Sequence, residues 1–90
     1  MTCLVAQSAS YVGSVDVLYV NFNGRESLSA CHAVEDTPSG ITVMYSEDGA
    51  VVGCEVMDFS ERYRLPAKIH VDTKNPFEVS VVRADGLAVS

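Results

Sequence analysis

Apolar and polar residues alternate along most of this chain with the period of two that is typical of β-strands. The clearest case is a hairpin, with strands predicted at residues 41–46 and 51–57 around the turn sequence Glu-Asp-Gly-Ala. In the second of these strands, valines and a cysteine share one face, whereas Glu55 lies on the other. Gly53, in the middle of the same strand, indicates a β-bulge or a closely packed neighbour.

A second apolar segment, residues 15–22, has hydrophobic side chains on both faces and is therefore predicted to be a central strand. The dipeptide Asn23-Gly24 favours a tight hairpin turn, after which residues 26–34 are predicted to return beside this strand. The same kind of alternation predicts three further strands, at residues 3–7, 67–72 and 77–83.

Only one short helix is indicated. Asp58 and Glu61 have the spacing of a capping box, with Asp58 as the N-cap, and Pro66 ends the helix within about two turns. No window of ten or more residues has a sustained helical pattern. The sequence therefore predicts a mostly β fold, namely a small antiparallel sheet or meander of about five to seven strands with at most one short helix.

Composition agrees with one folded domain over residues 1–90, because 48% of the residues are hydrophobic and only 20% are charged. No apolar run approaches the roughly 18 to 20 residues that span a bilayer. The three cysteines are odd in number and widely spaced, unlike the dense, even set of a small secreted scaffold. We therefore expect a cytoplasmic protein with reduced thiols and no membrane contact.

Charge is distributed unevenly. The net charge is −6, and residues 26–61 contain eight acids and no Lys or Arg, whereas residues 62–90 contain five bases against three acids. A net negative charge argues against direct nucleic-acid binding, since nonspecific binding requires a basic surface. An acidic surface can instead merely keep a protein soluble, or it can recognise a basic partner. The candidate partner-binding residues are Glu35, Asp36, Glu47, Asp48, Glu55, Asp58 and Glu61.

Cysteine and histidine offer the alternative chemistry. Cys31, His32, Cys54 and His70 are candidate zinc ligands or members of a Cys/His nucleophile pair, which would make the protein a thiol- or metal-dependent enzyme. They lack the paired spacing of structural zinc sites, and a free cysteine on an apolar strand commonly acts as a small hydrophobe. Phosphate-binding loops and dinucleotide fingerprints are absent from the sequence, so we expect neither a cofactor nor a metal.

The segment from Asp16 to about Tyr63 resembles the bacterial domain-of-unknown-function family 2283. The residues that carry the resemblance are DVLYV and, after a spacer, GITVMYSEDGAVVGCEVMD, in which Gly49, Gly53 and Glu55 surround an apolar hairpin. The resemblance covers about half the chain; the extra strands expected after Pro66 depart from it. It implies a small β-rich prokaryotic or phage protein, often one partner of a toxin and antitoxin pair, without assigning a chemical activity.

The resulting hypothesis is a non-enzymatic module that binds a basic protein, such as a toxin or a nucleic-acid-handling effector, in the manner of an antitoxin or a defence inhibitor. The alternatives are the Cys/His enzyme and a structural subunit with no activity of its own. A homo-oligomer through free strand edges is also expected to be feasible, because a small open sheet leaves edges to cover.

Overall fold

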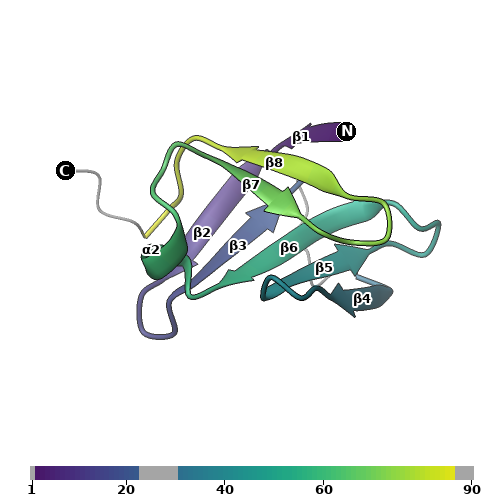
Figure 1. Cartoon of the computed structure of the whole chain (residues 1–90), viewed down its shortest axis with the longest axis horizontal. Helices are drawn as coiled ribbons and strands as arrows, with labels where there is room; N and C mark the ends of the chain where they lie inside the picture. Colours follow the sequence, from purple (N-terminus) through teal and green to yellow (C-terminus); the bar gives the residue numbers. More distant parts are fainter. Residues whose placement is uncertain (1, 23–30, 87–90) are drawn as a thin grey trace.

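The computed structural model describes residues 2–22 and 31–86, which form eight strands and one short helix (Figure 1). In chain order these are β1 (Thr2–Val5), β2 (Ser8–Val12), β3 (Val17–Asn21), β4 (Ala33–Asp36), β5 (Ile41–Tyr45), β6 (Val51–Met57), α2 (Phe59–Arg62), β7 (Ala67–Val71) and β8 (Phe77–Val81). The prediction of a mostly β fold with at most one short helix is confirmed. No helix in the two described stretches is long and apolar enough to cross a bilayer.

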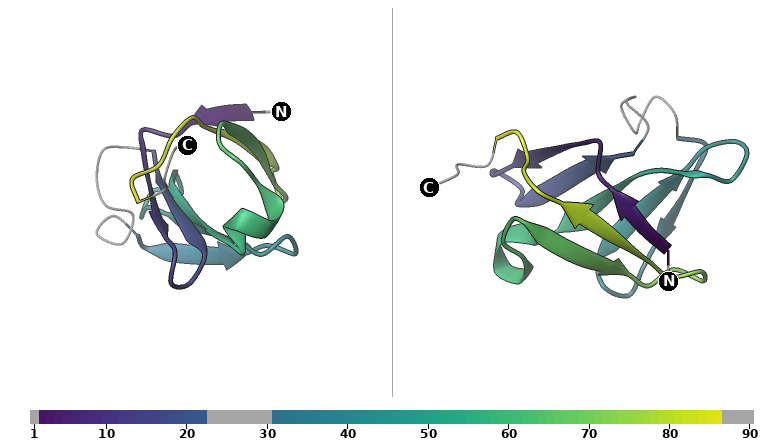
Figure 2. Two further views of the ribbon diagram at one scale, coloured as in Figure 1. Left: turned by 90° about the vertical axis from the view of Figure 1, so that its left-hand side faces the viewer. Right: turned by 90° about the horizontal axis from the view of Figure 1, so that it is seen from above.

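The eight strands divide between two sheets, a division that the prediction of a small antiparallel sheet or meander of about five to seven strands did not specify. A five-stranded antiparallel sheet has the order β2-β3-β6-β5-β4, and a three-stranded sheet has the order β1-β8-β7, in which β1 runs parallel to β8. Figure 2 shows the two sheets curving around a shared interior. The division has a physical cause, because each sheet has one apolar face and stacking the two buries both faces in one core.

A continuous seam joins the two sheets along one side. β1 pairs with β8 from Thr2 opposite Phe77 onward, and the same sequence offset returns in a parallel bridge between Ser10 and Asp85. The backbone N–H of Tyr11 donates to the carbonyl oxygen of Asp85 at 2.7 Å. Gly86 closes the seam with φ +83°, and a Cβ there would collide with the carbonyl oxygen of Tyr11. This position therefore requires glycine.

On the other side of the interior, side chains link the loop between β4 and β5 to the end of β7. The hydroxyl of Ser39 donates to Asp72 Oδ1 at 2.6 Å, and the hydroxyls of Ser39 and Thr37 lie 3.0 Å apart. Thr37 is buried, and its hydroxyl oxygen also accepts a hydrogen bond from the backbone N–H of Ile41. This polar link fixes the edge of one sheet against the other, where no backbone pairing joins them among the described residues.

The core lies between the sheets and is filled by aliphatic side chains from both. Its fully buried members on β3, β5 and β6 face those on β7 and β8, and Phe59 of α2 closes one end. β3 lies between β2 and β6, which confirms that the apolar segment around it forms a central strand. The buried cluster comprises Ala9, Leu18, Val20, Ile41, Val43, Cys54, Val56, Phe59, Ile69, Val71, Phe77, Val79 and Val81.

Two predicted details of the hairpin and its neighbours have different outcomes. The β5–β6 hairpin is present, and its register shifts after the pair Met44 and Gly53, which confirms a bulge beside Gly53. The prediction that residues 26–34 return beside the central strand is wrong for the described part, because β4 pairs with β5 instead. β2 occupies the position beside β3 that was predicted for residues 26–34. Its exposed serines explain why the apolar pattern did not predict a strand there. The predicted Asn23-Gly24 turn lies outside the described residues.

Candidate functional site

The seven acids predicted to bind a partner lie at three separate places on the fold. These are Glu47 and Asp48 in the turn between β5 and β6, Glu35, Asp36 and Glu55 on the strands, and Asp58 and Glu61 beside α2. The turn and α2 lie at opposite ends of β6, which at about 3.3 Å per residue separates them by roughly 20 Å. The acids therefore surround one sheet and do not form a single patch.

The net negative charge belongs to the five-stranded sheet. Its described residues, 8–22 and 31–57, contain six carboxylates and neither Lys nor Arg. Residues 58–86, which form α2, β7 and β8, contain five carboxylates and five Lys or Arg side chains. Within the described parts of the chain, no ion pair joins a carboxylate of this sheet to a base. The negative field of the sheet is therefore not neutralised by an ion pair among the described residues.

Glu55 occupies the middle of the outer face of this sheet, away from the core. It lies opposite Tyr19 of β3 on one side and Thr42 of β5 on the other, and it is half-buried. Neither Arg62 nor Arg64 forms an ion pair with it in the described structure. Glu55 is thus a half-buried carboxylate that faces outward between half-buried neighbours.

Glu35 and Asp36, on the edge strand β4, are engaged by neighbouring hydroxyls. Tyr45 donates its phenolic O–H to Glu35 Oε1 at 2.8 Å, and Thr42 donates to Asp36 Oδ1 at 2.7 Å. Burial and then the carboxylate of Glu35 raise the pKa of Tyr45 to about 12, so the phenol remains a hydrogen-bond donor. These hydrogen bonds leave the two carboxylates less freedom to rearrange.

Glu47 and Asp48 form the exposed tip of the β5–β6 hairpin. Asp48 accepts a hydrogen bond from the hydroxyl of Ser46 and another from the backbone N–H of Ala50, which lowers its pKa. The following residue, Gly49, has φ +86°, which suits glycine in a tight turn. Asp48 therefore stabilises the turn, whereas Glu47 projects from it without a side-chain partner in the described chain.

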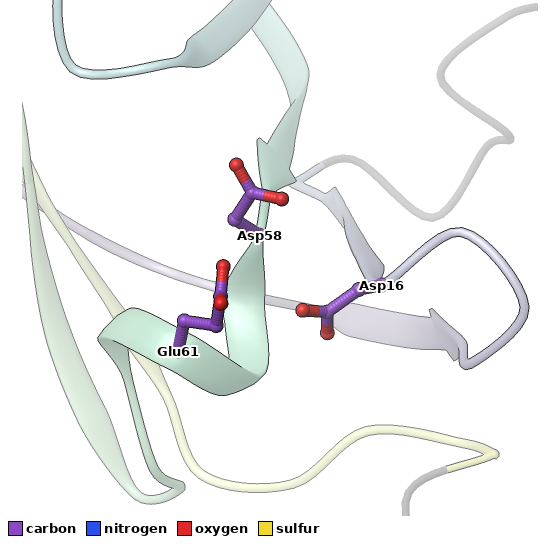
Figure 3. A group of neighbouring side chains, drawn as sticks. All are labelled: Asp16, Asp58 and Glu61. Carbon is purple, nitrogen blue, oxygen red and sulfur yellow. The ribbon is translucent and has the colours of Figure 1, made fainter.

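Beside α2, the chain brings three carboxylates together, as Figure 3 shows. Ligand oxygens of Asp16, Asp58 and Glu61 all lie within 4.8 Å of one another. Asp16 comes from the turn between β2 and β3, whereas Asp58 and Glu61 come from the end of β6 and from α2. Asp16 was not among the predicted site residues, because nothing local in the sequence indicates that this turn meets α2.

Asp16 performs the helix-capping role that the sequence assigned to Asp58. Asp58 is the N-cap residue, but its backbone is left-handed with φ 52° and its side chain makes no capping hydrogen bond. Instead, Asp16 Oδ1 accepts from the backbone N–H of Ser60 at 3.0 Å, and Oδ2 accepts from the Ser60 hydroxyl at 2.8 Å. The prediction of a capping box was therefore wrong, because a carboxylate from a distant turn satisfies the free N–H of the helix.

Tyr11 completes the contacts of Asp16 by donating its phenolic O–H to Asp16 Oδ1 at 2.6 Å. This hydrogen bond, together with those from Ser60, lowers the pKa of Asp16. Oxygen ligands of this kind suit Ca²⁺ or Mg²⁺. A cation here would have to compete with Tyr11 and Ser60 for the oxygens of Asp16. The arrangement is explained by its structural role in holding α2 against the five-stranded sheet.

The cysteines and histidines of the enzyme hypothesis do not form one cluster in the described structure. Cys54 is buried in the core, and desolvation raises the pKa of its thiol to about 12, which favours an inert thiol over a nucleophilic thiolate. Cys31 precedes β4, His32 is exposed beside it, and His70 is exposed on β7 of the other sheet. Among the described residues, none of the four belongs to a group of three or more potential metal ligands.

Comparison with known proteins found no match among protein-family models, curated proteins or solved structures. The resemblance to the domain-of-unknown-function family 2283 therefore stays a prediction from the quoted residues.

Proposed function

We propose that this protein is a non-enzymatic, acidic protein-binding module that engages a basic partner. The partner class that suits it is a toxin or another nucleic-acid-handling effector, so that the protein would act as an antitoxin or a defence inhibitor. One observation carries the proposal: the described residues of the five-stranded sheet contain six carboxylates and neither Lys nor Arg.

Electrostatics explains why this partner class fits. Proteins that handle nucleic acids present basic grooves to phosphate groups, and an acidic surface is attracted to the same grooves. The attraction acts mainly on the rate of encounter and on partner choice, since each exposed ion pair contributes only about 0.2–1 kcal/mol. Binding directly to nucleic acid is disfavoured for the same reason, because the sheet and the phosphates have charge of the same sign.

The test begins with affinity capture from the native host at low and at high salt, followed by reconstitution with the purified partner. We expect one specific basic partner whose dissociation constant rises as salt increases from about 0.1 M to 1 M, since the screening length shortens from about 10 Å to 3 Å. If the partner is an enzyme that acts on nucleic acid, the protein should inhibit it at stoichiometric concentration.

A charge-neutralised variant provides the control. All seven candidate acids would be changed to the corresponding amides, and circular dichroism would confirm that the variant still folds. We expect this variant to lose most of the salt-dependent affinity for the purified partner. A partner that binds the variant and the original protein equally, or with no dependence on salt, would overturn the proposed function.

A further inference from the structure

The outer face of the five-stranded sheet carries an exposed apolar row at the end nearest α2. Directly opposed residues of an antiparallel sheet share a face, and one such row joins Val12 of β2, Val17 of β3 and Met57 of β6. Val17 is buried with 3% exposure, whereas Val12 and Met57 are 39% and 44% exposed. The middle residue of the row is therefore buried, and the apolar side chains on either side of it are accessible to solvent.

The neighbouring row on the same face is polar and contains Glu55. Tyr19 lies beside this carboxylate on β3 and presents a half-buried aromatic ring. We refer to Val12, Tyr19, Glu55 and Met57 as the outer-face patch. It combines apolar contact area, an aromatic ring that can receive a cation, and a carboxylate without an ion pair in the described structure.

Carboxylates also border the far end of this patch. Asp58 directly follows Met57 in the chain, and Glu61 lies within the same group of oxygens beside α2. The exposed apolar row thus has Glu55 in the neighbouring row on one side, and Asp58 follows Met57 directly on the other. No Lys or Arg is present on the described part of the five-stranded sheet to compete for these carboxylates.

We propose that the outer-face patch docks a basic amphipathic segment of the partner. Its apolar side chains lie against Val12 and Met57, and its Lys or Arg side chains meet Glu55 on one side and Asp58 on the other. Charge complementarity favours this occupant, because a purely apolar segment would leave the carboxylates unmatched and a purely basic one would gain only weak exposed ion pairs. The inference rests on the proposed function and assigns it a location and a recognition chemistry.

The test uses two synthetic peptides of equal length and charge with the full-length protein. One peptide contains Lys and Leu, and the other has every Leu replaced by Ser. We expect the Lys/Leu peptide to bind more tightly and to shift the backbone amide resonances of the outer-face patch. The double change Asp58→Asn with Glu61→Gln should weaken its binding about two- to tenfold, as expected for the loss of two accessible charges.

Matched variants at the other end of the sheet are the controls. Glu47→Gln with Asp48→Asn removes the same charge and should change the affinity less than the double change beside α2. Similarly, Met57→Ser should weaken binding, whereas Val34→Ser, at a residue that is 60% exposed on the edge strand β4, should not.

The outcomes separate this inference from the proposed function. Equal effects of the two double variants, or equal affinities for the Lys/Leu and Lys/Ser peptides, with salt dependence retained, would overturn the assigned surface and leave the acidic module intact. Failure of both peptides to bind at low salt would contradict the docking surface. If the reconstituted natural partner were also insensitive to salt, the proposed function would fall as well.

Discussion

Asp16 accepts hydrogen bonds from both the backbone N–H and the hydroxyl of Ser60, a residue 44 positions later in the chain. The contact places α2 over the open end of the core, where Phe59 packs between Tyr11 and Tyr63 with ring-centroid distances of 5.9 and 6.0 Å. A carboxylate in the turn between β2 and β3 therefore sets the position of the helix. This relationship makes Asp16 a structural residue inside an acidic surface.

Replacing Asp16 should destabilise the protein. Asp16→Ala removes the acceptors for Ser60 and Tyr11, and alanine also disfavours the left-handed backbone that Asp16 adopts with φ 53°. Asp16→Asn should be milder, since asparagine tolerates that backbone and keeps one acceptor oxygen. In urea denaturation, the original protein should have the highest midpoint, the Asn variant a lower one and the Ala variant the lowest. The control is Glu61→Gln, which changes an exposed charge and should leave the midpoint nearly unchanged; a midpoint for Asp16→Ala equal to that of the control would contradict the structural role.

Phe59 should be the most sensitive position in α2, because it is only 1% exposed and closes the core. Phe59→Ala should lower the free energy of unfolding by about 3–5 kcal/mol, and Phe59→Leu by roughly 1–2 kcal/mol. The total free energy of unfolding of a small domain is about 5–15 kcal/mol, so the alanine variant is expected to be close to unfolding. The leucine variant is expected to remain folded, so its free energy of unfolding can be measured by chemical denaturation. An unchanged free energy of unfolding in this variant would contradict the packing of the Phe59 ring.

Stability should decrease in acid through Asp16 and Asp72. Hydrogen bonds from Tyr11 and from Ser39, respectively, are the main causes that hold the pKa values of these carboxyls below the ordinary value of 3.8. Because the unfolded chain binds protons more readily, the stabilisation is complete above about pH 4 and is lost as the pH falls through the lower folded-state values. Unfolding midpoints measured between pH 6 and pH 2.5 should show this decrease.

The variant Asp72→Asn tests the assignment of that pH dependence. It lacks one of the two titrating groups, so its stability should fall less steeply in acid than that of the original protein. Relief of repulsion among the many exposed carboxylates acts in the opposite direction and is common to both proteins. Identical slopes below pH 4 would show that Asp72 does not contribute to the acid sensitivity.

Local alternation was enough to predict the parts of the fold that depend on short segments. β3, β5 and β6 each bury a set of residues spaced by two, and their sequence pattern follows directly from this burial. Gly53 likewise marked the bulge, because glycine weakens the interior of a strand and often occurs there at a bulge or a close contact. The division into two sheets was not predictable in this way, since it depends on β1 pairing in parallel with β8, at the opposite end of the chain.

The candidate site, like the fold, could be predicted only where it depends on local sequence. The excess of acids on one sheet could be foreseen, because residues 26–61 lack any Lys or Arg. Their separation into three places follows from the hairpin, whose turn and far end lie at opposite ends of β6. Asp16 was missed because its partner Ser60 is distant in sequence, and no pattern around either residue indicates the other.

The thiols should differ sharply in reactivity. Cys3 is exposed, whereas Cys54 is buried and has a pKa raised to about 12, so alkylation of the folded protein should modify Cys3 and spare Cys54. Mass spectrometry after brief iodoacetamide treatment, with and without denaturant, measures the difference. Rapid modification of Cys54 in the folded state would contradict its burial in the core and would support a thiol-dependent activity.

Glu55 should contribute to binding at the expense of stability. It lies between Tyr19 and Thr42 on a central strand, where a β-branched residue is preferred and glutamate is not. Glu55→Thr should therefore raise the free energy of unfolding by about 0.5–1 kcal/mol and weaken the binding of a basic partner. Denaturation and titration of the same variant give both quantities. Thr42→Val is the control on the same outer face, since it leaves the charge unchanged and should affect binding less than Glu55→Thr. A variant of Glu55 that gains stability with full affinity would show that the carboxylate serves only the solubility of the sheet.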